Sequence, residues 1–228
     1  MSLYTKFVST ALFPLHERLK RHDSVAVRRA MERDQWLAPA QIESIQVARL
    51  RDLLTDIGAN VPYYREMFEQ FGFSPASVTS VAALGQLPLL TKSIIRAKLE
   101  SMRHSRSTGL VRYNTGGSSG EPLVFFIGRK RASHDVSAKW RATRWWGVDI
   151  GDPEIVVWGS PIELGKQDLV KALRDRLLRT HLLPAFEMSS SRLDQFVASI
   201  RSIAPRMLFG YPSALSRIAR HAQERGLT

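Results

Sequence analysis

Apolar residues recur at helical spacing in the first part of the chain and in short, strand-like runs in the second. The clearest helical pattern covers residues 39–57 and is expected to end near Gly58. Its apolar residues form one broad face and are Ile42, Ile45, Ala48, Leu50, Leu53, Leu54 and Ile57. Residues 1–105 are therefore expected to form a helical N-terminal region that packs on the core.

From residue 106 onward, short runs rich in strand-forming residues alternate with helical segments. Strands are expected at 110–113, 123–127, 155–158, 181–185 and 207–209, and helices at 169–178, at 193–203 and after Gly210. Strands that alternate with helices need crossover connections, and these produce a largely parallel sheet. The predicted fold class is α/β: a helical N-terminal region, then a mixed, largely parallel sheet covered by helices. Residues 106–228 are its α/β portion, within one incomplete large domain.

Two loops follow expected strands of this sheet. In open parallel sheets, ligands collect at the carboxyl ends of the strands. The candidates for a substrate pocket are accordingly Gly159, Ser160, Gly210, Tyr211, Pro212 and Ser213. Ordinary strand-to-helix turns also use glycine, serine and proline, so the pattern alone leaves both interpretations open.

Residues 114–122 place three glycines and three hydroxyl side chains between two expected strands. Glycine reaches positive φ without a steric penalty, so successive amides can turn toward an anion while hydroxyl groups add donors. The candidate phosphate-binding residues are Thr115, Gly116, Gly117, Ser118, Ser119 and Gly120. A Walker P-loop and a dinucleotide fingerprint are excluded, because both open a helix and a P-loop also needs a lysine. A hairpin tip without a ligand remains open.

The same loop also matches Gly-x-Ser-x-Gly, the nucleophile elbow of serine hydrolases, with Ser118 as nucleophile. An elbow turns from a strand into a helix, whereas a strand is expected here. Asp152 or Asp168, followed by His181, has the chain order of a triad, but only geometry establishes one. The serine hydrolase is kept as an alternative.

The loop and the segments around it resemble the adenylate-forming (AMP-binding) enzymes. Residues 115–122 are similar to the family's Thr/Ser-Gly-Ser/Thr-Ser/Thr-Gly-x-Pro phosphate loop. Upstream, Gln35-Trp36, Gln46, Arg49-Leu50, 61–65 and 87–92 resemble the phenylacetate-CoA ligase branch in order and spacing. Downstream, Trp140-Arg141, 145–147 and 210–215 resemble the CapK-type members of that branch, which are associated with capsular polysaccharide biosynthesis.

This resemblance implies an ATP-dependent ligase that activates a small-molecule carboxylate as an acyl-adenylate, with ATP and magnesium as cofactors and coenzyme A as one acceptor. The family's adenine-stacking segment, its ribose-binding aspartate and its C-terminal domain with the catalytic lysine have no counterpart in the 228 residues. The chain is therefore expected to be the N-terminal portion of such a ligase, to carry no catalytic residue, and to be inactive alone. The acyl substrate and the acceptor stay open.

The charge balance raises a second class of function. Lysine and arginine number 33 against 21 aspartates and glutamates, a net charge of +12 that attracts polyanions in general. Basic residues between 129 and 144 lie on both sides of Trp140 in the sequence, and Trp145 and Trp146 follow directly. We favour a helix that buries tryptophan and keeps its arginines in solvent, so nucleic acid is not an expected partner. A non-catalytic anion-binding or subunit-interaction module remains the alternative.

Residues 3–22 combine apolar residues near helical spacing with the basic cluster Arg18, Lys20, Arg21 and His22. Such a segment is able to contact an anionic membrane surface. Packing on the rest of the protein or on a second subunit is favoured, because Pro14 interrupts the pattern.

The chain lacks cysteine, which excludes disulfides and thiolate metal sites, and its six histidines show no ligand spacing. No metal site is expected. No apolar run reaches the roughly 18 residues of a bilayer span, and no secretory signal is expected. These features predict a cytoplasmic protein and leave open a homo-oligomer and a peripheral position at the inner membrane.

Overall fold

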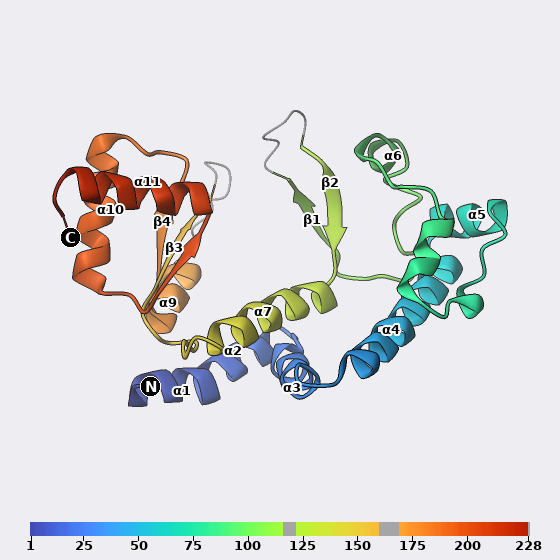
Figure 1. The fold of residues 1–228 in the computed structure, drawn as a ribbon, viewed down its shortest axis with the longest axis horizontal. Helices are drawn as coiled ribbons and strands as arrows, with labels where there is room; N and C mark the ends of the chain where they lie inside the picture. Colours follow the sequence, from blue (N-terminus) through green and yellow to red (C-terminus); the bar gives the residue numbers. More distant parts are fainter. Residues whose placement is uncertain (116–121, 160–168, 228) are drawn as a thin grey trace. The chain divides into compact units, whose positions relative to one another are not determined.

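The computed structural model describes residues 1–115, 122–159 and 169–227. The chain forms two compact units, which we treat separately (Figure 1). Unit 1 combines Met1–Val25 with Ala138–Thr228, and unit 2 is Ala26–Ser137. The domain boundary expected near residue 105 stays a prediction.

A three-stranded parallel sheet forms the centre of unit 1. Strand β3 (Glu154–Trp158) lies between β4 (Thr180–Pro184) and β5 (Met207–Gly210), and Val156 pairs with Leu182 on one side and Phe209 on the other. Helix α9 (Leu169–Leu178) connects β3 to β4, and α10 (Ser190–Ile203) connects β4 to β5. These crossovers confirm the predicted parallel arrangement of strands and helices.

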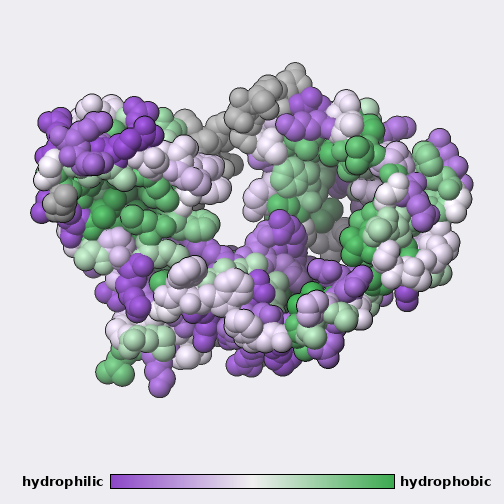
Figure 2. All heavy atoms as spheres, viewed as in Figure 1, coloured by the Kyte–Doolittle hydropathy of each residue, from purple (hydrophilic) through white to green (hydrophobic). Residues whose placement is uncertain are grey.

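The core of unit 1 lies between this sheet and the two helices α10 and α11 (Pro212–Glu224). Ile155 and Val157, alternate residues of β3, are completely buried against Phe196 of α10 and Ile218 of α11, among others. An apolar groove of about 550 Å³ follows α10 and α11, where Figure 2 shows hydrophobic residues gathered on the surface.

The N-terminal segment of unit 1 is one continuous helix made of α1 (Leu3–Phe7), the π-helical turn η1 (Val8–Leu12) and α2 (Phe13–Leu19). Pro14 does not break it, because this residue lies in the first turn of α2, directly after the π turn. Phe13 packs edge-to-face on Trp140, with 5.1 Å between ring centroids. A Cβ at Gly151 would lie 2.6 Å from Cβ of Val8, so the helix approaches the loop before β3 at a position that only glycine allows.

Unit 2 is mainly helical. It contains α3 (Ser24–Asp34, which begins in unit 1), α4 (Pro39–Asn60), α5 (Pro62–Gln70), the 3₁₀ helices η2 (Pro75–Ser77) and η3 (Val81–Gln86), and α6 (Lys92–Ala97). Its core consists of Leu54, Met67, Phe68, Phe73 and Val78. Helix α4 continues past Gly58, where its end was expected, because this glycine faces the Phe68 ring: a Cβ there would lie 3.0 Å from Cδ2.

An antiparallel hairpin completes unit 2. Strands β1 (Val111–Asn114) and β2 (Val124–Ile127) pair in a sheet of their own, with Asn114 opposite Val124. Helix α7 (Arg129–Arg144) follows, and the division between the units falls within it. The hairpin confirms the expected strand on each side of the glycine-rich loop.

Within the described ranges, no helix is both long and apolar enough to cross a bilayer.

Candidate functional site

The glycine-rich loop joins the two strands of the hairpin. Gly116, Gly117, Ser118, Ser119 and Gly120 lie outside the described residues, so their geometry stays a prediction. Thr115 is described and exposed. Its backbone N–H donates to the Leu123 carbonyl at 3.0 Å, and its Oγ1 accepts from the Leu123 N–H at 3.0 Å. Thr115 therefore closes the base of the loop.

A surface cavity of about 460 Å³ lies where the hairpin enters this loop. Its lining residues are Arg112, Tyr113, Asn114, Pro122 and Val124. Arg112 forms no ion pair with any residue in the described part of the chain. A guanidinium and an amide two residues apart on one strand share a face, so Arg112 and Asn114 present polar groups on the same side. The sequence analysis did not name Arg112 as a site residue. Its two-residue spacing from Asn114, immediately before the loop, was the feature that could have indicated it.

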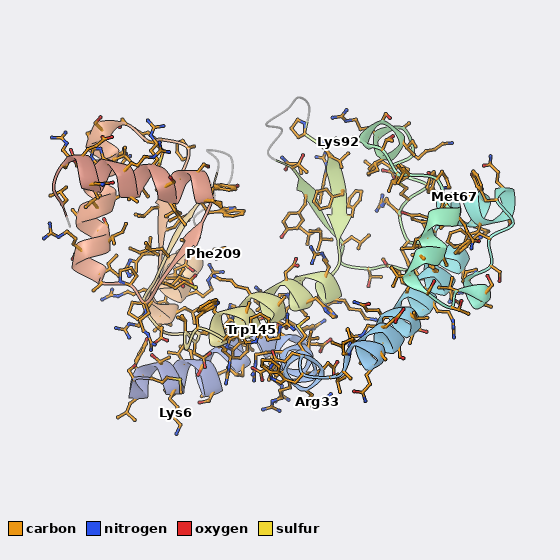
Figure 3. The ribbon with its side chains drawn as sticks, viewed as in Figure 1. Lys6, Arg33, Met67, Lys92, Trp145 and Phe209 are labelled. Carbon is orange, nitrogen blue, oxygen red and sulfur yellow. The ribbon has the colours of Figure 1, made fainter. Side chains whose placement is uncertain are left out.

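In unit 1, three aromatic residues stack at the carboxyl ends of β3 and β5. One of them, Phe209, is labelled in Figure 3. The rings of Trp158 and Tyr211 are 4.2 Å apart and 15° from parallel, and those of Trp158 and Phe209 are 6.2 Å apart at 16°. Each side chain is close to 40% exposed: 39% for Trp158, 40% for Phe209 and 42% for Tyr211. We call these three residues the aromatic stack. It gives this edge of the sheet a flat apolar surface.

Lys139 of α7 lies beside the aromatic stack. Its Nζ is 4.4 Å from the centroid of the Phe209 ring and donates to Oε1 of Glu154 at 2.8 Å. The carboxylate of Glu154 compensates the charge of Lys139, so an anionic ligand would compete with that ion pair. Lys139 is therefore engaged by Glu154 and by a cation–π contact with Phe209, and is not an open anion site.

The structure brings the described residues of the two predicted pocket loops to the same edge of the sheet, because β3 and β5 are adjacent and parallel. Gly159 has φ of +102°, which favours glycine where the chain leaves β3. A Cβ at Gly210 would lie 2.3 Å from the Val157 carbonyl oxygen. Tyr211, Pro212 and Ser213 begin α11, with Pro212 at its first position. Ser160 lies outside the described residues.

Backbone geometry alone explains why Gly159 and Gly210 are glycines. The argument that these two loops bind a ligand therefore depends on the aromatic stack beside them. The phosphate loop belongs to unit 2 and the pocket loops belong to unit 1.

The candidate triad is not assembled in the described residues. Asp152 is buried, accepts from the Thr5 hydroxyl at 2.8 Å and from the Asp149 N–H at 3.0 Å, and pairs with Arg206. His181 lies at the start of β4 and shares no hydrogen bond with Asp152. Ser118 and Asp168 fall outside the described ranges.

Three carboxyl groups with a shifted pKa belong to helices and to neither of the two loops. Burial opposes ionisation of Glu17 in α2, yet hydrogen bonds from Ser24 and His22 outweigh it and lower its pKa. A hydrogen bond from His104 lowers the pKa of Asp56 in α4, and one from His221 lowers that of Asp194 in α10. These carboxylates support the fold, because they tie their helices to other segments: Ser24 and His221 belong to helices, and His22 and His104 to loops.

No family model matches the chain. It is 26% identical over 178 residues to protein CapK of Staphylococcus aureus, a match that covers 78% of this chain and 39% of CapK. The structure resembles 2-hydroxyisobutyryl-CoA ligase in its postadenylation state in complex with 2-HIB-AMP, with a TM-score of 0.61, 20% identity, and coverage of 84% of this chain and 41% of the ligase. An open conformation of that ligase in complex with 2-HIB-AMP and CoA gives a TM-score of 0.60 at 20% identity and covers 84% and 45%.

The chain therefore spans about two fifths of CapK and less than half of the ligase. It is homologous to CapK over part of its length, and its fold is that of part of an adenylate-forming ligase. Both the resemblance and the fold class predicted from the sequence are confirmed at this level.

Proposed function

We propose that this relative of CapK, with the fold of part of an adenylate-forming ligase, is the N-terminal portion of an ATP-dependent, AMP-forming, carboxylate-activating enzyme. The phenylacetate-CoA ligase and CapK-like branch is the one we assign. The observation that carries the proposal is the context of the glycine-rich loop, which connects the paired antiparallel strands β1 and β2. Because a strand and not a helix follows the loop, a Walker P-loop and a dinucleotide fingerprint do not fit, and the phosphate loop that residues 115–122 resemble is retained.

In the proposed reaction, a carboxylate oxygen attacks the α-phosphorus of ATP and pyrophosphate leaves, which forms the acyl-adenylate. An acceptor such as the thiol of coenzyme A then attacks the acyl carbon and releases AMP. Residues 115–120 would offset the charge of the β- and γ-phosphates through amide and hydroxyl donors, an electrostatic role without covalent catalysis. Arg112 adds a cation at the base of the loop.

Magnesium would enter this site with the nucleotide. The described residues hold no group of three His, Cys, Asp or Glu side chains able to bind a metal. Mg²⁺ is commonly held by substrate phosphates with one or two carboxylates and water, so it needs no site made only of protein side chains. The hydroxyl groups of the loop would face an ion that arrives with the nucleotide. The ion would neutralise the departing pyrophosphate.

We assign the aromatic stack to the wall of the acyl pocket. Parallel rings at the carboxyl edge of the sheet offer an extended apolar surface, and Lys139 beside it is already paired with Glu154. An apolar acyl group therefore fits this wall better than a densely charged one.

The first test measures binding by isothermal titration calorimetry of MgATP and of adenosine to the 228-residue chain. We expect MgATP to bind, adenosine to bind far more weakly, and Arg112→Ala to weaken MgATP roughly tenfold by removing a charge-assisted contact. The matched control is Arg201→Ala, an exposed arginine of α10. Equal effects of both substitutions, or equal affinity for adenosine, would contradict phosphate recognition by the loop.

The second test uses pyrophosphate exchange in a protein that carries this sequence together with the rest of the ligase. Gly117→Val or Gly120→Val should lower exchange by roughly two orders of magnitude, because a lost preorganised donor set costs about that much. Unchanged exchange counts against the assignment. For the chain alone we expect no turnover, and acyl-AMP formation by it would overturn that expectation.

A non-catalytic anion-binding module is the second candidate, favoured by the net charge of +12. Salt titration separates the two. A polyanion surface loses affinity steeply with salt, whereas a specific phosphate pocket retains most of it.

A further inference from the structure

The N-terminal helix of residues 3–19 has two faces of unlike character. Its inner face is buried in unit 1 and includes Thr5, Val8, Phe13 and Glu17. Its outer face exposes four large apolar side chains: Leu3 at 88%, Phe7 at 56%, Leu15 at 56% and Leu19 at 76%. We call these four residues the outer stripe. Packing within unit 1 thus accounts for only half of the apolar pattern in this segment.

The π turn places the outer stripe on a single line. In a straight α-helix, Leu15 would lie about 80° around the axis from Phe7, because eight residues exceed two turns by that angle. The turn Val8–Leu12 accommodates one extra residue, which reduces the offset to about 20° in the opposite sense. Leu3 and Phe7 before the turn, and Leu15 and Leu19 after it, therefore share one face.

Positive charge outweighs exposed negative charge around this stripe, where Asp23, directly after the segment, is the exposed carboxylate. Residues 1–22 contain Lys6, Arg18, Lys20 and Arg21, all exposed, and Lys6 projects outward from α1 in Figure 3. The carboxylate in this range, Glu17, is 2% exposed and accepts hydrogen bonds from Ser24 and His22 on the inner side. The outer face therefore presents cations and large apolar groups together.

We propose that the outer stripe and its four cations dock on the surface of an anionic lipid bilayer. The helix would lie in the plane of the interface, with the apolar side chains at the acyl boundary and the cations beside the lipid phosphates. A second copy of the chain fits this face poorly, since it would bring eight like charges together. The outer stripe and its cations share no residue with either loop of the proposed ligase site.

The test is cosedimentation of the purified protein with vesicles of phosphatidylglycerol and phosphatidylcholine, compared with vesicles of phosphatidylcholine alone. We expect binding to the anionic vesicles that weakens as salt is added. The double variant Phe7→Ser/Leu19→Ser should bind on the order of tenfold more weakly, because two large apolar groups no longer enter the interface. Lys6→Glu/Arg18→Glu should lose on the order of tenfold or more.

The matched control is Leu89→Ser/Arg201→Glu, which removes an exposed apolar side chain and an exposed cation elsewhere, and should retain wild-type binding. All the substituted residues are exposed, so circular dichroism should show an unchanged fold. The proposal is overturned if the wild-type protein ignores anionic vesicles, or if the control loses as much binding as the stripe variants. It is also overturned if Phe7→Ser/Leu19→Ser dissociates a dimer in sedimentation velocity while vesicle binding persists.

Discussion

The two units reach stability by different means. Unit 1 is assembled from chain segments far apart in sequence, and its N-terminal helix is fixed by a close backbone approach and by buried polar groups. Unit 2 is one continuous stretch whose core of five apolar residues comes from neighbouring helices and turns. Unit 1 therefore depends on the identity of a few residues, and unit 2 on the volume of its core.

The polar contacts of unit 1 centre on Asp152. Its carboxylate accepts from the Thr5 hydroxyl and the Asp149 N–H, and the Asp149 side chain in turn accepts from the Trp140 indole. Because these groups are buried, each hydrogen bond stabilises the fold more than an exposed one would, and each lost partner leaves an uncompensated group.

The largest effect is expected from Gly151→Val. The new side chain would overlap Val8 at 2.6 Å, and φ of +94° is unfavourable for any other residue. We expect a loss of about 3 to 5 kcal/mol in the free energy of unfolding. Urea denaturation followed by tryptophan fluorescence reports on unit 1, which holds four of the five tryptophans.

The matched comparison is Gly151→Ala in unit 1 against Gly72→Ala in unit 2, with both variants followed by circular dichroism. Gly72 has φ of +60°, but nothing lies within 4 Å of a Cβ there, so the cost should be about 1 to 2 kcal/mol. Equal costs at Gly151 and Gly72 would show that backbone conformation alone matters, and that the approach of Val8 contributes nothing.

Next comes Phe68→Ala, which tests whether unit 2 depends on core volume. The ring is buried against Phe73, with centroids 5.1 Å apart, and faces Gly58. Its removal should cost about 3 to 4 kcal/mol, whereas Phe68→Leu should cost under about 1.5 kcal/mol. Urea unfolding followed by circular dichroism measures both variants, and a Leu variant as unstable as the Ala variant would contradict a volume-dominated core.

Asp152→Asn is expected to cost about 2 to 3 kcal/mol, because the amide keeps the shape but loses the charge that faces Arg206 and the Asp149 N–H. Asp175→Asn is the control. Asp175 is half-buried and pairs with its neighbour Arg174, so a change of about 0.5 kcal/mol or less is expected in the same urea assay. Similar losses in both variants would argue against a special role for the Asp152 contacts.

The pH dependence of unit 1 should contain a contribution from Glu17. Since its folded pKa is below the ordinary value of 4.5, the ionised group stabilises the fold above that value. This stability is lost as the pH falls through the lowered pKa. Glu17→Gln should flatten this part of the profile of unfolding free energy between pH 5 and roughly pH 3. A variant with the wild-type slope would assign the acid sensitivity to other carboxylates.

The smallest effect is expected at the comparable carboxylate–histidine contact of unit 2. Asp56 lies 3.2 Å from the His104 ring nitrogen, but its side chain is 53% exposed. Solvent screens such pairs, so Asp56→Asn should change the free energy of unfolding by at most about 0.5 kcal/mol. A loss as large as that of Asp152→Asn would remove the contrast between the units.

The sequence predicts the elements of this fold well where one pattern dominates. The run Ile155-Val156-Val157 predicts a buried strand, and the glycine-rich loop predicts a hairpin through its two flanking strands. The errors occur where tertiary contacts override local preference. Gly58 reads as a helix end but faces an aromatic ring within α4, and Pro14 reads as a break but follows a π turn.

In the candidate site, too, local features could be predicted from the sequence and tertiary contacts could not. The loop positions follow from residue types, but the pairing of Trp158 with Tyr211 depends on which strands become neighbours. The bond between Thr5 and Asp152 is likewise invisible to local patterns, because it joins the two ends of unit 1. Arg112 could have been found from its spacing to Asn114, but the cavity beside it could not.

The meeting of Val8 and Gly151 also restricts how relatives of this protein can vary. Position 151 is constrained twice, by its backbone conformation and by its neighbour, so a smaller residue at position 8 does not release it. Position 8 is constrained only by size. An alignment of homologues should therefore show an invariant glycine at 151 opposite a column that drifts among small aliphatic residues, without compensating exchanges between the two.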